Sequence, residues 1–303
     1  MDFLYVLEKL RVPVLNEFML GITYLGDEIA FLVVALILMW CVDKRTGYYV
    51  LSVGFLGTIA NQFMKLWFRI PRPWVLDESF TILEQAREAA SGYSFPSGHT
   101  QSSVGTFGAI AYTTKNKAIR WLCIAAAVLV PFSRMYIGVH TPLDVGVAAL
   151  MAVALILLLK PVVLGKNRCV FPAFLGIMIV VSAAFLCFVE CYPFPADIDP
   201  HNMTSGLKNA YTLLGAILGM TVVYIVDEKW LHFSTKAVWW AQILKTILGL
   251  ALVLLVKSGL KAPLECVFGT LVGRSVRYFL IVIVAGIAWP TTFPLFAKLG
   301  KKE

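Results

Sequence analysis

Long apolar stretches constrain this chain more than any other feature of its sequence. Nine of them lie between residues 21 and 296, and only short polar connections separate them. Several reach the roughly 20 residues that a helix needs to cross the hydrocarbon core of a bilayer. Within a bilayer the backbone has to satisfy its hydrogen bonds inside its own segment, so such stretches fold as helices. We therefore predict an all-α, polytopic transmembrane bundle of about nine spans, forming one integral membrane domain over residues 1–303.

The charge of the chain fits a membrane protein. Charged residues make up 15% of the sequence and hydrophobic residues 59%, whereas a soluble domain has roughly 25% charged residues. The net charge of +8 does not indicate a nucleic-acid partner, because Lys and Arg collect in the cytoplasmic loops of membrane proteins. With basic connections such as Lys44–Arg45 and Lys115–Arg120 on the cytoplasmic side, the N-terminus lies on the opposite side. The partners expected are the bilayer and a membrane substrate, with no particular oligomeric state predicted.

Three polar motifs interrupt the apolar sequence between residues 65 and 144. The motifs are Lys65 with Arg72-Pro73, then Pro96-Ser97-Gly98-His99, then Ser133-Arg134 with His140 and Asp144. In the predicted topology each motif lies at the same end of the spans that it touches. All three therefore meet on the non-cytoplasmic face, where they gather three cations, two histidines and a carboxylate.

The three cations are suited to holding a phosphate. Arg72 and Arg134 carry planar forks that match phosphate oxygens, and Lys65 adds a compact charge. Ser97 and Gly98 precede an expected helix start, where unpaired N–H groups and the helix dipole favour an anion. Phosphoryl transfer depends mainly on positioning and charge stabilisation. We expect these five residues to bind the substrate phosphate, with no metal and no cofactor.

The two histidines allow a division of labour in hydrolysis. Asp144 follows His140 by four residues, a separation that places two side chains on one face of a helix. A carboxylate that holds one imidazole nitrogen fixes the tautomer and leaves the other nitrogen free to attack phosphorus. We expect His140 to be the nucleophile, oriented by Asp144, and to form a phosphohistidine. His99 is then the general acid and later the base for water.

These motifs resemble those of the type-2 phosphatidic acid phosphatase superfamily, which includes the lipid phosphate phosphatases. The resemblance covers residues 65–144 and holds at every motif position. It implies a metal-independent phosphomonoesterase or pyrophosphatase that works through a phosphohistidine. It also implies a six-helix core with the site on the non-cytoplasmic side.

A weaker resemblance concerns the layout of the whole chain. The nine-span plan and the segments Arg72–Asp77 and Leu207–Asn209 look similar to the glucose-6-phosphatase branch, and sphingosine-phosphate phosphatases also carry extra C-terminal spans. We expect residues 1–165 to form the phosphatase core and residues 166–303 to add transmembrane helices. Lys208, beside Asn209, is a candidate to face the pocket.

Several functions agree with these patterns. The leading hypothesis is hydrolysis of a lipid phosphate, such as phosphatidate, a polyprenyl pyrophosphate or a sphingoid-base phosphate. The alternative enzyme acts on a sugar phosphate, which an enclosed polar pocket would favour. The non-enzyme alternative is a phosphate-binding transporter or pseudoenzyme. The set of His99, His140 and Asp144 argues against it, because binding alone needs no oriented nucleophile.

Polar residues outside the motifs have simpler interpretations. Residues 78–91 resemble a short surface helix, and the acidic loop 192–206 is interpreted as solvated rather than as a cation site. We interpret Arg274 and Arg277 as anchors of a helix end rather than as a site for lipid headgroups. The cysteines Cys187, Cys191 and Cys266 are interpreted as free, although a bridge among them is an alternative.

Overall fold

The protein is described here by a computed structural model that covers residues 1–87, 90, 92–167 and 169–299. Helices dominate these residues, and no strand occurs among them. The chain divides into two compact units. Unit 1 contains residues 1–34, 49–161 and 193–206, and unit 2 contains residues 35–48, 162–192 and 207–303. The all-α class predicted from the apolar stretches is confirmed.

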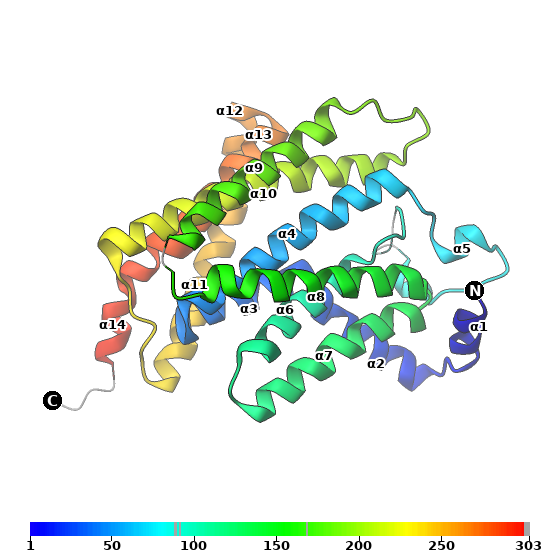
Figure 1. Ribbon diagram of the computed structural model, residues 1–303, viewed down its shortest axis with the longest axis horizontal. Coiled ribbons are helices and arrows are strands. Elements are labelled where there is room, and N and C mark those ends of the chain that lie inside the picture. The colour runs from blue at the N-terminus through cyan, green and yellow to red at the C-terminus, as the bar shows by residue number, and fades with distance from the viewer. Residues whose placement is uncertain (88–89, 91, 168, 300–303) are drawn as a thin grey trace. The chain divides into compact units, whose positions relative to one another are not determined.

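Unit 1 is built on a helical pair. Helices α6 (Gly98–Thr113) and α7 (Lys117–Tyr136) are joined by a three-residue turn and pack side by side (Figure 1). Asn116 accepts hydrogen bonds from the N–H groups of Ala118 and Ile119 and so caps the start of α7. The short turn holds the two helices antiparallel. As a result the start of α6 and the end of α7 lie at the same end of the pair.

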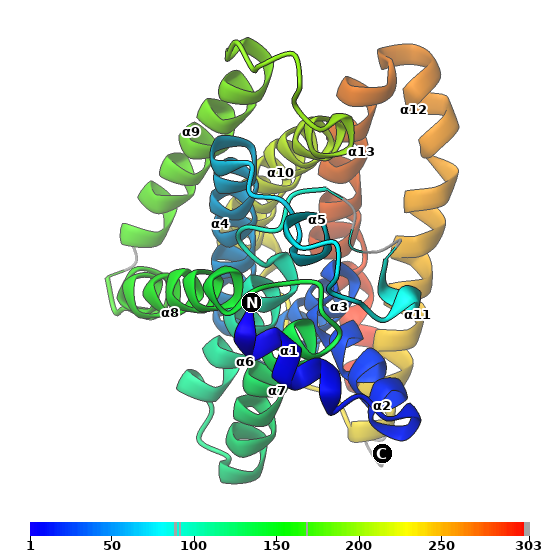
Figure 2. The same ribbon diagram turned by 90° about the vertical axis from the view of Figure 1, so that its right-hand side faces the viewer.

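Unit 1 also contains several other helical segments. They are α1 (Asp2–Lys9), α2 (Pro13–Thr23), η1 (Tyr24–Gly26), the first part of α3 (Glu28–Ile37), most of α4 (Lys44–Phe68), α5 (Pro73–Leu76), η3 (Glu84–Ala86), most of α8 (Pro142–Leu164) and the start of α10 (Pro200–Val226). Proline begins α2, α5 and α8, where its missing N–H costs nothing and its fixed φ suits a helix start. Helix α1 lies against α7 (Figure 2).

The predicted surface helix over 78–91 is wrong for the described residues of that segment. They form one 3₁₀ turn, Glu84–Ala86, while residues 88, 89 and 91 lie outside the described residues. Phe80 and Ile82 alternate into a buried cluster with Leu4 of α1. Tyr5 of α1 donates a hydrogen bond to Asp77 across 2.8 Å. Phe80 and Ile82 are two residues apart, which is the spacing of side chains on one face of an extended chain. Packing both of them against α1 therefore keeps this segment extended rather than helical.

Unit 2 holds the remaining helices. They are η2 (Leu38–Val42), α9 (Val170–Cys191), the rest of α10, η5 (Asp227–Leu231), α11 (Trp239–Gly259), α12 (Lys261–Phe268), α13 (Thr270–Ile283), η6 (Val284–Ala288), η7 (Pro290–Thr292) and α14 (Phe293–Lys298). Helix α11 packs against α13 and α14. Lys44 forms an ion pair of 2.5 Å with Asp227 in this unit. All six cysteines are free, so no bridge joins Cys187, Cys191 or Cys266.

Six helical stretches of the described chain are long and apolar enough to cross a membrane, or seven if a bent pair counts as one span. The six are 117–136, 142–164, 170–191, 200–231, 239–268 and 270–298. The bent pair joins Pro13–Gly26 to Glu28–Val42 at an angle of 56°. Helix α6 has only 16 residues, and α4 is 25 residues long but does not meet this test. The protein is an integral membrane protein, and the number of nine spans stays a prediction.

Arg274 and Arg277 lie in the second turn of α13, close to its start at Thr270. Arg274 donates through Nε to Thr212 Oγ1 at 2.6 Å. Arg277 is buried, and its NH1 lies 3.8 Å from a carboxylate oxygen of Glu265. Both side chains therefore contact neighbouring helices of unit 2.

Candidate active site

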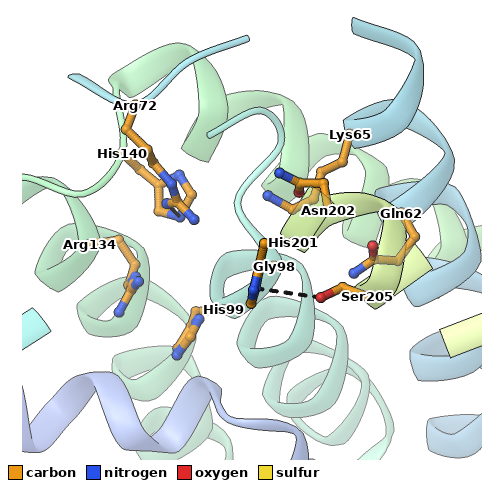
Figure 3. A pocket seen from close by; sticks show the side chains of 10 residues that line it. All are labelled: Gln62, Lys65, Arg72, Gly98, His99, Arg134, His140, His201, Asn202 and Ser205. Atoms are coloured by element: carbon orange, nitrogen blue, oxygen red, sulfur yellow. Dashed lines mark hydrogen bonds between the residues drawn. The ribbon is translucent and has the colours of Figure 1, made fainter. Parts of the chain in front are cut away.

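A polar pocket of about 160 Å³ lies in unit 1 (Figure 3). Its lining is Gln62, Lys65, Arg72, Gly98, His99, Arg134, His140, His201, Asn202 and Ser205. Six of these were predicted from the three motifs. The structure thus brings residues 65 to 140 to one cavity, as the topology argument requires. Ser97 and Asp144 are buried behind the lining.

Two of the cations are oriented by main-chain carbonyls of the segments that precede α6 and α8. Lys65, in the last turn of α4, donates to Tyr93 O at 2.7 Å. Arg72 donates through Nε to Gly92 O at 3.0 Å and through NH1 to Val139 O at 2.9 Å. The acceptors are neutral, so the positive charge is left for a ligand. Burial lowers the pKa of Arg72 to about 10, which still leaves it charged at neutral pH.

The third cation, Arg134, reaches the pocket from the last turn of α7. Its NH1 donates to Thr23 Oγ1 at 2.8 Å. Arg134 is 2% exposed, and its Nε has no hydrogen-bond partner within the described part of the chain. A buried donor without an acceptor costs free energy, on the order of 1–3 kcal/mol. An anion in the pocket would supply that acceptor.

The contacts of His140 decide which of its nitrogens is protonated. Arg72 NH1 lies 3.0 Å from His140 Nε2. A guanidinium has no acceptor, so Nε2 must accept this hydrogen bond and carries the lone pair. The proton of the neutral ring is therefore on Nδ1, on the side of Ser94 and Asp144. Burial, and after it the charge of Arg72, hold the pKa of His140 well below its ordinary value, so the ring is neutral.

Asp144 acts on His140 largely through Ser94, a residue that the sequence did not indicate. The Nδ1 to Asp144 Oδ2 distance is 3.6 Å, too long for a hydrogen bond. Ser94 Oγ lies 3.3 Å from Nδ1 and donates to Asp144 Oδ2 at 2.5 Å. Ser94 is fully buried, so this bridge is shielded from water.

The spacing of His140 and Asp144 has a different cause from the one expected. His140 does not lie on a helix, because α8 begins at Pro142. Asp144 Oδ2 accepts from Thr141 N at 2.7 Å, and Thr141 Oγ1 accepts from Asp144 N at 3.2 Å. This reciprocal cap of the helix start is a capping box. The cap places the carboxylate beside the histidine that precedes the helix.

His99, in the first turn of α6, is paired with Asp27, which precedes α3. The distance from His99 Nε2 to Asp27 Oδ1 is 2.9 Å. The bend between the two N-terminal helices lets this carboxylate reach His99. Gly26 is needed there, because a Cβ on it would lie 2.9 Å from His99 Cβ and from His99 O. The motifs alone could not reveal Asp27, which lies 38 residues before the first of them.

The two motif residues that begin α6 occupy different places. Gly98 lines the pocket as the first residue of the helix. Ser97 precedes it as the N-cap, and its Oγ accepts from Thr100 Oγ1 at 2.9 Å. We find the Ser97 side chain fully buried, bonded within the helix start rather than lining the cavity. The free N–H groups of the first turn of α6 remain available to an anion.

The acidic loop 192–206 is largely exposed up to residue 201, as expected of a solvated loop, but its second part forms the start of α10. Asp199 Oδ1 accepts from Asn202 N at 2.7 Å and so caps α10. Asp199 N in turn donates to Tyr93 Oη at 3.0 Å. The first two turns of α10 then present His201, Asn202 and Ser205 to the pocket. Lys208 is not among the lining residues.

Taken together, these contacts describe a polar, positively charged site whose chemistry is suited to an anion such as a phosphoryl group. Three buried cations lie around a neutral imidazole that lines the cavity and whose lone pair accepts a hydrogen bond from Arg72. A second imidazole, paired with a carboxylate, lies on the same cavity. Among the described residues no group of three or more His, Cys, Asp or Glu side chains is arranged to hold a metal ion.

Comparison with known proteins agrees with this description. The model of the PAP2 superfamily matches residues 45–168, and that of the PAP2 superfamily phosphatase transmembrane extension matches residues 211–302. Undecaprenyl-diphosphatase BcrC of Bacillus subtilis (strain 168) is 32% identical over 138 residues, which are 44% of this chain and 66% of that protein. Phosphatidylglycerophosphatase B of the same organism is 32% identical over 150 residues, 45% of this chain and 69% of the relative.

Two further proteins are similar over part of the chain. A probable sphingosine-1-phosphate phosphatase of Dictyostelium discoideum is 32% identical over 146 residues, 44% of this chain and 35% of that protein. The crystal structure of a transmembrane PAP2 type phosphatidylglycerolphosphate phosphatase from Bacillus subtilis has a TM-score of 0.46 at 28% identity, over 55% of this chain and 85% of that one. The chain thus spans about two thirds of the two bacterial relatives. It belongs to the PAP2 superfamily of phosphatases and carries the transmembrane extension of that family.

Proposed function

We propose that the protein hydrolyses a lipid phosphate monoester or pyrophosphate through a phosphohistidine on His140, without a metal. The observation that carries the proposal is the set of contacts around this ring. Its Nε2 accepts a hydrogen bond from Arg72 NH1, while Nδ1 lies beside the Ser94–Asp144 bridge. A binding site or transporter would need the cations but not a nitrogen nucleophile with a fixed tautomer.

The first half of the reaction transfers the phosphoryl group to the enzyme. The phosphate oxygens take the N–H donors of Lys65, Arg72 and Arg134, which frees the lone pair of His140 Nε2 from Arg72. The lone pair attacks phosphorus as the bond to the leaving oxygen breaks. Protonated His99 gives its proton to that oxygen. The imidazolium that forms at His140 is stabilised by Asp144 through Ser94.

In the second half of the reaction His99 acts as a base instead of an acid. Neutral His99 takes a proton from water as the water oxygen attacks phosphorus. The P–N bond breaks, inorganic phosphate leaves, and His140 returns to its neutral state. Asp27 has a clear place in this cycle, since its carboxylate stabilises His99 each time the ring is protonated.

The proposed site faces the non-cytoplasmic side. Lys115, Lys117 and Arg120 lie in and beside the turn that joins α6 to α7, at the opposite end of this pair from Gly98 and Arg134. Cytoplasmic loops carry an excess of Lys and Arg, so the pocket end of the pair is the outer end. The headgroup of a lipid in the outer leaflet would reach a pocket at this outer end of the helices.

Phosphate release by the purified, detergent-solubilised protein tests this proposal. Phosphatidate, a polyprenyl diphosphate and a sphingoid-base phosphate are each offered with a chelator present. We expect release from at least one of them, and an acid-labile phosphoprotein when the reaction with labelled substrate is quenched. Loss of activity with the chelator that added metal restores would contradict the metal-free mechanism.

A second candidate function is hydrolysis of a sugar phosphate. The polar lining of the pocket favours it, because no apolar side chain is among the ten lining residues. Glucose 6-phosphate belongs in the same assay. Faster release from it than from every lipid would replace the lipid proposal with this one.

A further inference from the structure

The pocket has a second wall that the proposed mechanism does not use. It consists of Gln62 on α4 and of His201, Asn202 and Ser205 on α10. In Figure 3 Gln62, Asn202 and Ser205 lie across the cavity from Arg72, Arg134 and His140, on the same side as Lys65. We call this set the α10 wall. Most of it belongs to a segment that follows the residues matched by the PAP2 superfamily model.

Hydrogen bonds and packing hold the α10 wall against the loop that positions Lys65 and Arg72. Asn202 donates through Nδ2 to Asp199 at 2.7 Å, and Asp199 N donates to Tyr93 Oη at 3.0 Å. The carbonyl of the same Tyr93 accepts from Lys65. Asn202 is also buried tightly against Gly92, whose carbonyl holds Arg72. One loop thus positions two phosphate-binding cations and the α10 wall together.

The chemistry of the α10 wall differs from that of the opposite side. Two amides, one hydroxyl and one imidazole line it, with no Lys, Arg, Asp or Glu among them. A second phosphate would call for further fixed cations, as the first phosphate does. A hydrocarbon chain would replace water beside these polar groups and could form no hydrogen bond with them, which is unfavourable. Hydroxyl groups, which both donate and accept, are the ligands that amides and hydroxyls can satisfy.

The size of the pocket limits what lies beside the phosphate. Its volume of about 160 Å³ is below the roughly 300–1,000 Å³ of pockets that enclose a drug-sized molecule. There is room for a phosphate and a small group next to it. A long tail, if the substrate has one, stays outside.

We propose that the α10 wall is the subsite for the alcohol esterified to the phosphate, and that this alcohol is a polyol. The inference rests on the proposed phosphatase function and narrows its substrate class. It favours phosphomonoesters of glycerol-like or sugar-like headgroups over diphosphates and over esters without a neighbouring hydroxyl. Ser205 and His201, whose Oγ and Nε2 lie 3.5 Å apart, are the specificity-determining pair.

Two substrates that differ by one hydroxyl provide the test. Phosphatidylglycerophosphate is compared with its analogue in which propanediol replaces the glycerol between the two phosphates. We expect wild-type protein to prefer the hydroxyl-bearing lipid by roughly tenfold in kcat/KM, as a well-placed hydrogen bond to a substrate hydroxyl gives. In Ser205→Ala and His201→Ala this ratio should fall toward one. Ser258→Ala, an exposed serine of α11, is the matched control and should keep the wild-type ratio.

The outcomes separate this inference from the function on which it rests. A ratio unchanged by Ser205→Ala and His201→Ala, in active protein, would overturn the polyol subsite alone. So would a wild-type preference for a polyprenyl diphosphate. Wild-type protein that releases no phosphate from any substrate would overturn the proposed function, and the subsite with it. A parallel arm with glucose 6-phosphate and hexyl phosphate distinguishes a soluble sugar phosphate from a lipid headgroup as the source of the polyol.

Discussion

Two buried lysines, one in each unit, show how the same side chain serves different purposes. Lys65 is 9% exposed and Lys245 is fully buried, and each donates to main-chain carbonyls. Lys65 lines a polar cavity that it shares with Arg72 and Arg134. Lys245 donates to Trp40 O at 2.9 Å and its Nζ lies 4.3 Å from the ring centroid of Phe293.

The difference lies in what completes the environment of each cation. In unit 2, carbonyls and an aromatic face surround Lys245, as a cation–π contact allows. In unit 1, the neighbours of Lys65 include two more cations, and Arg134 keeps an unused donor. The first arrangement is complete without a ligand, while the second needs an anion. Burial of a charge therefore indicates function only when the protein itself does not satisfy it.

The largest effect is expected from His140→Ala. It removes the proposed nucleophile, so turnover should fall by about 10⁴-fold or more, the scale seen when a covalent catalyst is removed. The thermal midpoint should change little, because the pocket gains only a small cavity. His232→Ala in unit 2 is the matched control. Appreciable turnover by a purified, folded His140→Ala protein would rule out the phosphohistidine.

Lys65→Met and Lys245→Met test the comparison directly. Lys65→Met should lower kcat/KM by roughly 10²–10³-fold, as loss of one charge-stabilising donor does. Lys245→Met should leave kcat/KM of the folded protein unchanged. It should lower the stability by about 1–3 kcal/mol, because the carbonyls of Trp40 and Thr235 lose their donor. Steady-state kinetics measure kcat/KM of the two variants, and thermal unfolding in detergent measures their stability. An equal fall in kcat/KM for both variants would contradict the different roles given to Lys65 and Lys245.

Asp27→Asn should weaken the general acid and leave the nucleophile intact. We expect a loss of about 10–100-fold in kcat with an alkyl phosphate, within the range that general acid catalysis contributes. With p-nitrophenyl phosphate the loss should be much smaller, since that leaving group needs no proton. Glu28→Gln, next in the chain, is the control. A loss of the same size for both leaving groups would show that Asp27 has only a structural role.

The smallest effect on activity is expected from Asp227→Asn in unit 2. The change breaks the ion pair with Lys44, whose side chain is 27% exposed while that of Asp227 is 4% exposed. We expect a loss of stability of about 1–2 kcal/mol, since one partner is partly solvated. The activity of the folded protein should stay at the wild-type level. A thermal midpoint unchanged in detergent would show that the Lys44 pair adds nothing to unit 2.

The motif residues could be predicted to converge because each lies beside a helix end. Lys65 lies in the last turn of α4, Gly98 begins α6 and Arg134 lies in the last turn of α7. In a bundle that alternates direction, such positions come to one face. Asp27, Ser94 and His201 lie outside these motifs. Their contacts join residues far apart in the chain, and no local pattern records such a contact.

The sequence by itself determined the membrane class, the helical fold and the chemical groups of the site. Apolar stretches cannot satisfy their backbone in lipid except as helices, and three motifs at helix ends leave few other arrangements. Only the tertiary structure decided how those groups are tuned. It placed Ser94 between His140 and Asp144, brought Asp27 to His99 through a bend at Gly26, and brought the first turns of α10 to the pocket. The physical reason is that orientation and electrostatic environment depend on packing between distant segments, whereas helix formation depends on the local sequence.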